Sequence, residues 1–388
     1  MIYVHIPFCR SFCTYCDFYS EVAAKCRGAE SQARQDVLFE SYSKALGREI
    51  SLNSGMFTSN VNTLYIGGGT PSVLPLSVYT SLIRDLSASG ISAPFEEFTF
   101  EANPEDIVEK GEAYVEDLIR LGVNRFSMGV QSFDDDILRW MNRRHDVQTA
   151  RKAYSILENA GADNISIDLI FGLPQLSDSM WSHTMEKALD ISSKGVPPRH
   201  ISSYQLSVEP GSALAKLVER GIWSEASEEL CSHQYSMLCD TLAKAGYHHY
   251  EISNFAQPGY EAKHNSAYWN HTPYIGLGPG AHSFVSGSAE GVMSRRWNNP
   301  DLRAYIADPG SVREHENLTQ DQIVMEKIML SLRTSAGISE SFLRVHADPS
   351  ALASALHGGD LIPSHIPGNL RIAESRFFVS DNIICSLV

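Results

Sequence analysis

Three cysteines near the start of the sequence, Cys9, Cys13 and Cys16, have the spacing C-x3-C-x2-C. They directly follow 2–6, a short apolar run that predicts a buried strand. Three thiolates on one tight loop can each bind one iron of a cubane [4Fe-4S] cluster. Because no fourth ligand is nearby, the fourth iron stays open to chelate the amino and carboxylate groups of S-adenosylmethionine (SAM), whose sulfonium an electron from the cluster can cleave. A zinc knuckle, which usually takes four ligands, and three buried free thiols are the alternatives.

A glycine run, 67–69, follows the next predicted strand, 63–66, and continues into Thr70. Residues without a Cβ let the backbone approach a ligand closely, so the run suits the amino group of SAM. Carboxylates and an amide could hold the ribose hydroxyls and the amino group, and a guanidinium could hold the carboxylate. The candidates for these contacts are Gly68, Gly69, Thr70, Glu101, Gln131, Arg143 and Asp168. Taken singly, Arg143 could be a surface charge, Asp168 a strand-end cap and Gln131 a buried turn residue.

Six apolar runs alternate with stretches of helical periodicity in the first half of the sequence. They cover 2–6, 63–66, 98–100, 125–130, 165–171 and 201–206. This βα alternation predicts an α/β fold with a parallel sheet, and six units fall short of the eight of a closed barrel. We therefore expect an open, partial (β/α)6 barrel. Except for Asp168, which lies within its run, the strand-borne candidates lie at or just past strand ends, where βα barrels build their active sites.

The pattern changes after residue 210. A predicted helix over 228–245 precedes a loop-rich tract over 264–284. Thr319 and Gln322 form a capping box for a helix that extends to Leu332, and the tail 370–387 reads as a hairpin. We expect a barrel over 1–210, a connecting region over 211–304, and a small helical, winged-helix-like domain over 305–388, so that an α+β region follows the barrel.

The composition limits the possible partners and compartments. The chain has 388 residues, 43% of them hydrophobic, and a formal net charge of −15, which argues against a nucleic-acid partner. No apolar run approaches the length of a membrane span, and the first residues do not form a signal peptide. The remaining cysteines lack metal-like spacing, which favours reduced thiols in a cytoplasmic protein; they are Cys26, Cys231, Cys239 and Cys385.

Four stretches together resemble the oxygen-independent coproporphyrinogen III oxidase superfamily of radical SAM proteins. They are the cysteine loop, GGGTPS from Gly67, FSMGVQSF over 126–133 and ISIDLIFGLP over 165–174. The resemblance implies that Cys9, Cys13 and Cys16 ligate a [4Fe-4S] cluster. It also implies that SAM is contacted by Tyr3, Tyr15, Gly68, Gly69, Thr70, Glu101, Gln131, Arg143 and Asp168.

Two branches of that superfamily differ at recognisable positions. The oxidases carry another cysteine two residues after the third, where this sequence has Phe18, and an extension before the residue equivalent to Tyr3, where this sequence has two residues. His264, Asn265, Tyr268 and Trp269 instead resemble the HNxxYW signature of a haem-chaperone branch. The imidazole of His264 could bind haem iron, and the two aromatic rings could cover a porphyrin.

We therefore expect a haem chaperone that holds a [4Fe-4S] cluster and SAM, binds haem and passes it to acceptor proteins. An oxygen-independent coproporphyrinogen III oxidase, which decarboxylates propionates through a 5′-deoxyadenosyl radical in porphyrin biosynthesis, is the alternative. A radical SAM enzyme acting on an unrelated substrate is a third possibility.

Overall fold

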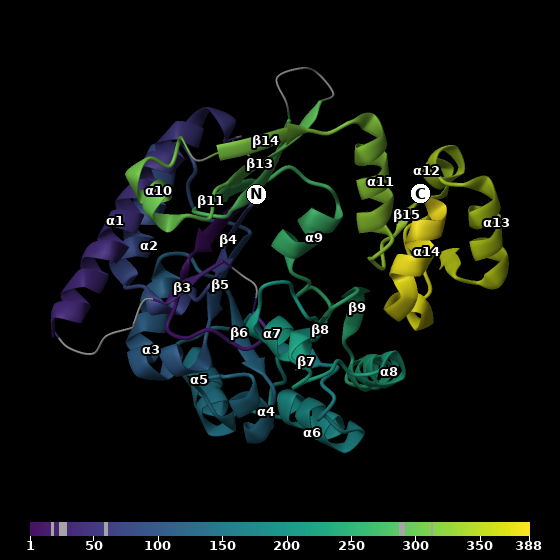
Figure 1. The fold of residues 1–388 in the computed structure, drawn as a ribbon, viewed down its shortest axis with the longest axis horizontal. Coiled ribbons are helices and arrows are strands. Elements are labelled where there is room, and N and C mark those ends of the chain that lie inside the picture. Colours follow the sequence, from purple (N-terminus) through teal and green to yellow (C-terminus); the bar gives the residue numbers. More distant parts are fainter. Residues whose placement is uncertain (17–18, 23–28, 58–60, 287–291, 312) are drawn as a thin grey trace.

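A nine-stranded sheet is the centre of the molecule in the computed structural model, which describes residues 1–388 except 17–18, 23–28, 58–60, 287–291 and 312 (Figure 1). Phe18 and Cys26 thus lie outside the described residues. Six neighbouring strands run parallel: β1 (Ile2–Ile6), β4 (Thr63–Gly68), β5 (Glu97–Ala102), β6 (Arg125–Gln131), β7 (Ile165–Phe171) and β8 (His200–Gln205). The edge beside β1 adds parallel β11 (Ile275–Leu277), and the edge beside β8 adds antiparallel β10 (Asn254–Ala256) and β9 (His248–Glu251).

Helices cover the outer face of this sheet, because alternate strand residues point toward them. In β1, for example, Ile2, Val4 and Ile6 are fully buried. Local residues start several of the helices: Pro104 begins α3, and the side chains of Asp134 and Asp146 cap α4 and α5. The helices of this part of the chain are α1 (Ala29–Asn53), α2 (Leu76–Ala88), α3 (Pro104–Arg120), α4 (Asp135–Trp140), α5 (Val147–Asn159), α6 (Asp178–Leu189), α7 (Ala213–Glu219), which begins beside the cysteine loop, and α8 (Glu228–Lys244). The predicted open barrel of six βα units is confirmed.

The region after the barrel contains a short helix, α9 (Lys263–Trp269), where the sequence predicted a loop-rich tract. That prediction is wrong at α9 because the cap of this helix comes from far away in the sequence. The backbone N–H groups of Lys263 and His264 donate to the buried carboxylate of Glu97, at 2.7 and 3.0 Å. A second sheet follows, made of β12 (His282–Ser286), β13 (Met293–Asn298) and β14 (Arg313–Asn317), with α10 (Leu302–Ala307) between the last two.

The C-terminal part forms a small unit on the side of the molecule opposite α1 in Figure 1. Its helix–strand–helix–helix–strand–strand order is winged-helix-like: α11 (Gln320–Ser331), β15 (Ile338–Ser339), α12 (Glu340–His346), α13 (Pro349–Gly358), β16 (Leu361–Pro363) and β17 (Asn369–Ile372), then α14 (Ser380–Leu387). The capping box of Thr319 and Gln322 is confirmed.

The predicted hairpin over 370–387 is wrong, since only β17 is a strand there. Ile383, Ile384 and Leu387 are buried together at helical spacing, which makes the last turns a helix. The domain boundaries at 210 and 305 stay predictions; α10 spans the second of them, and β14, just after it, pairs with β13. No helix within the described ranges is both long and apolar enough to cross a membrane.

Candidate functional site

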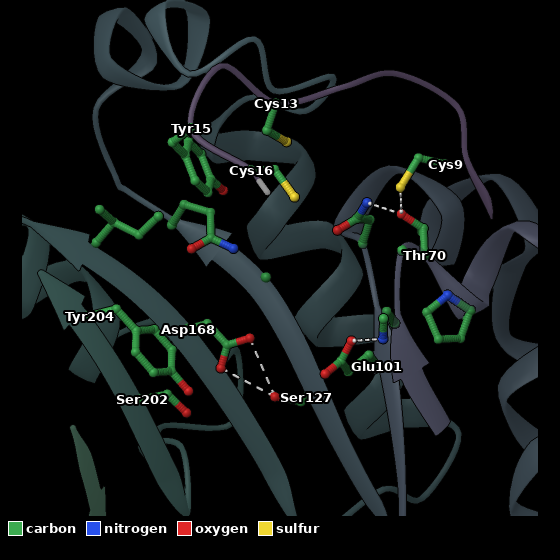
Figure 2. Close-up of a pocket in the computed structure, with 18 of the residues that line it drawn as sticks. Cys9, Cys13, Tyr15, Cys16, Thr70, Glu101, Ser127, Asp168, Ser202 and Tyr204 are labelled. Atoms are coloured by element: carbon green, nitrogen blue, oxygen red, sulfur yellow. Dashed lines mark hydrogen bonds between the residues drawn. The ribbon is translucent and has the colours of Figure 1, made fainter. Parts of the chain in front are cut away.

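A cavity of about 700 Å³ lies inside the barrel, beneath the cysteine loop (Figure 2). Most of the candidates predicted from the sequence line it: Tyr3, Cys9, Cys13, Tyr15, Cys16, Gly68, Gly69, Thr70, Glu101, Gln131, Arg143, Asp168, His264, Asn265 and Tyr268. Trp269, at the end of α9, is not among the lining residues, and its indole Nε1 is buried without a hydrogen-bond partner. The structure therefore brings both groups of candidates, those for SAM and those for haem, to one cavity.

The cysteine loop is held over the strand ends by backbone contacts to later parts of the chain. Its start is strand β2 (Phe8–Cys9), which pairs with β3 (Glu21–Val22). Further along, the N–H of Thr14 donates to the carbonyl of Met141 at 3.1 Å, and the carbonyl of Thr14 accepts from Leu214 at 2.8 Å. These bonds place the loop above the cavity, so that the three thiols lie along its mouth.

The sulfur atoms of Cys9 and Cys13 lie beside polar side chains. The Sγ of Cys9 lies 3.3 Å from the hydroxyl of Thr70, and Arg143 donates from Nη1 to the Sγ of Cys13 at 3.3 Å. The Nη2 of Arg143 donates to the carbonyl of Gly129 and to the side-chain oxygen of Asn103, both at 2.8 Å. Arg143 therefore links the cysteine loop to the end of β6.

The thiol arrangement fits a [4Fe-4S] cluster better than a single ion. Across the described ranges, no three histidine, cysteine, aspartate or glutamate side chains converge closely enough to hold one metal ion. A tetrahedral zinc site needs such convergence, whereas in a cubane each thiolate binds a different iron at a separate corner. Figure 2 shows Cys9 set apart from Cys13 and Cys16 along the loop. The donor set of three sulfurs around the cavity mouth thus suits the cluster.

The glycine run packs against the cysteine loop so tightly that no side chain fits. A Cβ on Gly69 would lie 2.7 Å from the carbonyl oxygen of Phe8 and 3.1 Å from the Sγ of Cys9. Gly68 has φ +106°, which side-chain-bearing residues rarely adopt, and its N–H donates to Glu101 at 3.1 Å. The run therefore leaves bare backbone between the thiols and the Glu101 carboxylate.

Glu101 and Asp168 reach the cavity from strands on either side of β6. Tyr65 donates to Glu101 at 2.6 Å, and Ser127 donates to Asp168 at 3.2 Å. Burial raises the pKa of Glu101 to about 7, against the opposing effect of the Tyr65 hydrogen bond. Burial also raises the pKa of Asp168. The hydrogen bonds that Asp168 accepts from Ser202 and Ser127, and the nearby positive charge of Arg125, oppose this rise. Both carboxyls would be stabilised as anions by a cationic or hydroxyl-bearing ligand.

Gln131 enters the cavity mouth through a local irregularity at the end of β6. The register between β6 and β7 shifts between Gly129 and Gln131, and Gln131 has φ +68°. Such a bulge turns a side chain away from the direction that a regular strand would give it. The strain is located at a candidate ligand contact, where strained backbone is often found.

The HNxxYW residues form the inner end of the cavity rather than a surface loop. His264 is 1% exposed; its Nδ1 lies 2.8 Å from the hydroxyl of Thr63 and its Nε2 3.1 Å from that of Tyr268. Burial lowers the pKa of His264 to about 3, so the ring is neutral. Asn265 donates to the buried carboxylate of Glu251 at 3.3 Å. Both ring nitrogens of His264 are therefore occupied in this structure.

Sequence reasoning missed a set of lining residues that lie within strands rather than at their ends. Alternate positions of each strand face the cavity, so the β6 and β8 residues follow a period of two. They are Arg125, Ser127 and Gly129 on β6, and His200 and Ser202 on β8, with Tyr65 on β4. The alternation of apolar and polar residues along each strand is visible in the sequence. The polar residues at the strand ends show which positions face inward, and counting back from them in steps of two would have identified these residues.

An open barrel with a three-cysteine loop over its strand ends is the architecture of the radical SAM class, and a model of the radical SAM superfamily matches residues 3–188. Among solved structures, coproporphyrinogen III oxidase (HemN) from Escherichia coli has the same fold, with a TM-score of 0.77 over 99% of this chain and 89% of that one, at 21% identity.

Curated relatives narrow the class further. The heme chaperone HemW of Synechocystis sp. is 33% identical over 87% of this chain and 78% of its own length. The heme chaperone HemW of Bacillus subtilis is 33% identical over 87% of this chain and 84% of its own length. The chain belongs to the HemW family of radical SAM proteins. The resemblance inferred from the sequence motifs is confirmed.

Proposed function

We propose that this protein is a cytoplasmic haem chaperone that holds a [4Fe-4S] cluster and SAM, binds haem and transfers it to acceptor proteins. The observation that carries the proposal is the shared cavity: the HNxxYW residues His264, Asn265 and Tyr268 line the same chamber as the cysteine loop and the SAM candidates. The name of the relatives, heme chaperone, supports the choice of cargo.

In this proposal Cys9, Cys13 and Cys16 hold the cluster, which, when bound, supplies an open iron for SAM and a source of single electrons. Arg143 keeps a positive charge at the Cys13 sulfur and fixes the loop to β6 through the carbonyl of Gly129. These contacts orient the thiols whether or not a cofactor is present.

SAM would lie between the glycine run and the two carboxylates. The bare backbone of Gly68 and Gly69 admits its amino group, and Thr70 closes that side. Glu101 and Asp168 would accept hydrogen bonds from its amino group and ribose hydroxyls, with Gln131 at the mouth. Tyr3 and Tyr15 would provide the remaining walls.

Haem would contact the HNxxYW residues that line the cavity, with His264 as the iron ligand and Tyr268 against the porphyrin; Trp269, predicted to cover the porphyrin, does not line the cavity. The structure adds a condition to this part of the proposal. Because the Thr63 and Tyr268 hydroxyls hold both nitrogens of His264, the imidazole can bind iron only after one of these bonds is exchanged. Replacing Tyr268 by Phe frees Nε2 and should therefore not weaken iron binding, whereas His264→Ala should.

The deciding experiment is anaerobic reconstitution followed by haem titration and a coproporphyrinogen III oxidation assay on the same sample. We expect stoichiometric haem binding and no product from coproporphyrinogen III. Haem binding that His264→Ala leaves intact, but that His271→Ala or His282→Ala abolishes, would mean that another histidine is the ligand. Turnover of coproporphyrinogen III without haem binding would replace the chaperone by the oxidase, and absence of both would favour a radical SAM enzyme with another substrate.

A further inference from the structure

Asn103 directly follows β5 and is the N-cap residue of α3, but its side chain does not cap the helix. Asparagine is among the best N-cap residues, because its side-chain oxygen can accept from the first N–H groups of a helix. Here the N–H groups of Asp106 and Ile107 donate instead to the backbone carbonyl of Asn103, at 3.1 and 3.2 Å. The side chain gives up a stabilising local contact and lines the cavity. Local rules broken in this way are typical of functional positions.

The amide of Asn103 joins side chains that contact two of the predicted cluster ligands. Its Nδ2 donates to the hydroxyl of Thr70 at 3.3 Å, and its Oδ1 accepts from Nη2 of Arg143 at 2.8 Å. The same hydroxyl lies 3.3 Å from the Sγ of Cys9 (Figure 2). The other terminal nitrogen of the guanidinium, Nη1, donates to the Sγ of Cys13 at 3.3 Å. A continuous chain of hydrogen bonds therefore connects one sulfur to the other through Asn103.

The direction of each bond in this chain follows from the groups that form it. A guanidinium only donates, so Arg143 holds the Asn103 amide with its oxygen toward the arginine and its N–H groups toward Thr70. Because the Thr70 oxygen accepts from that amide, its own hydrogen can be donated to the sulfur of Cys9. The donors at both ends are thus aimed at sulfur, as suits a metal-bound thiolate, which only accepts.

We propose that Asn103 is a positioning residue that aims one hydrogen bond at the sulfur of Cys9 and one at that of Cys13, and so raises the reduction potential of the cluster. The inference rests on the cluster of the proposed function. One electron from an external reductant makes the cluster more negative by one charge, and donors to its sulfurs stabilise the more negative form. The protons of the chain stay on their nitrogen and oxygen atoms throughout.

The backbone of Asn103 is fixed independently of its side chain, which makes the amide open to mutation. The backbone N–H donates to the hydroxyl of Ser72 at 3.1 Å, and that hydroxyl donates to the buried carboxylate of Asp106 at 2.9 Å. A change of side chain at Asn103 therefore keeps the bond that holds the end of β5.

The test is a potentiometric titration of the reconstituted protein with dithionite, read by EPR of the reduced cluster. Asn103→Ala removes both amide bonds, and we expect the equilibrium constant for one-electron reduction to fall about tenfold, a shift of about 59 mV to lower potential. Thr70→Val removes the hydroxyl beside Cys9 and should produce part of this shift. In the Thr70→Val background, Asn103→Ala should shift the potential less than it does alone, because one of its two routes is already missing.

Two further variants separate positioning from a structural role. Asn103→Ser cannot bridge Thr70 and Arg143 but can cap α3, so it should be more stable than Asn103→Ala and have an equally low potential. Asn124→Ala is the matched control. The Asn124 amide accepts from the N–H of Phe98 at 2.8 Å and donates to the carbonyl of Phe95 at 3.2 Å, near the opposite end of β5. Its loss should lower the stability of the metal-free protein and leave the potential unchanged.

Iron content, thermal unfolding and haem titration of every sample make each outcome decisive. A wild-type potential in the cluster-loaded Asn103 variants, a full shift that persists without the Thr70 hydroxyl, or an equal shift in Asn124→Ala refutes the inference and leaves the chaperone proposal standing. If neither Asn103 variant takes up iron, Thr70→Val decides, and an unchanged potential refutes the chain. The expected shifts in a protein that binds no haem support the role of Asn103 and refute the chaperone. A wild-type protein that takes up no cluster refutes both.

Discussion

Gly69→Ala is the smallest change that should disturb the cysteine loop without removing any ligand. The added methyl would lie 2.7 Å from the carbonyl oxygen of Phe8, 2.9 Å from that of Ile6 and 3.1 Å from the Sγ of Cys9. Ordinary van der Waals contact begins at 3.4 Å, so the loop must move by about 0.7 Å at Phe8. Two of these atoms belong to the backbone, which cannot rotate away as a side chain would.

That movement has a cost that can be worked out from the same contacts. The carbonyl of Phe8 accepts from the N–H of Thr70 at 2.7 Å, and that of Ile6 accepts from Gly69 itself at 2.8 Å. Overpacking costs about 1–3 kcal/mol, and a weakened hydrogen bond adds about 0.5–1.5 kcal/mol. We expect a loss of roughly 2–4 kcal/mol in unfolding free energy, and reduced iron content because the Cys9 sulfur is displaced.

Chemical denaturation and iron analysis after anaerobic reconstitution measure both effects. Gly55→Ala is the matched control, because a Cβ on Gly55 meets nothing within 4 Å and its backbone needs no positive φ. The control should keep wild-type stability and iron. If Gly69→Ala also keeps wild-type stability and iron content, the glycine run does not pack closely on the cysteine loop in solution, and the arrangement of Cys9 beside Gly69 is refuted.

Three further predictions concern the same cavity. Cys13→Ala should lose the roughly four irons per chain expected after reconstitution, whereas Cys385→Ala, at an exposed thiol, should keep them; equal iron in both would refute the ligand set. Since burial raises the pKa of Glu101 to about 7, SAM should perturb the EPR signal of the reduced cluster more strongly at pH 8 than at pH 6, and a Glu101→Gln protein with the same pH dependence would contradict this. The pKa of His264 lies near 3 when folded and near 6.5 when unfolded, so the unfolded chain binds more protons between these values and stability falls as pH drops below 6.5, by up to about 1.4 kcal/mol per pH unit. His264→Gln should flatten that dependence in urea titrations; an unchanged slope would mean that the ring is not buried and neutral.

The features that could be predicted from sequence are those in which chemistry and backbone are local. Cys9, Cys13 and Cys16 lie on one short loop, and the glycine run follows its strand directly, so their spacing already determines what they can do. The barrel followed from the alternation of apolar runs and helices. Its inner surface did not, because Arg125 and Ser202 stand within strands whose apolar outward residues dominate the pattern.

The helix α9 shows why the rest could not be predicted. Its first N–H groups are capped by Glu97, a residue 166 positions earlier than Lys263. The local sequence therefore contains no capping residue that would predict the start of a helix. The tail was misassigned for a related reason: Ile383, Ile384 and Leu387 pack into a small core whose other members only the fold supplies. In both cases tertiary contacts, not local propensity, decide the structure.

The position of α9 also connects the HNxxYW signature to the predicted SAM site through direct side-chain contacts. The His264 ring packs against Tyr65, with ring centroids 5.2 Å apart, and the Tyr65 hydroxyl donates to Glu101 at 2.6 Å. Glu101 in turn accepts from the N–H of Gly68, beside the cysteine loop. One aromatic residue thus separates the histidine expected to bind cargo from the carboxylate expected to bind SAM. A packed core transmits a shift at one residue to its neighbours. A movement of His264 toward haem iron would therefore displace the Tyr65 ring and alter its hydrogen bond to Glu101. Cargo and SAM would then contact opposite ends of one contiguous set of side chains, formed by His264, Tyr65 and Glu101.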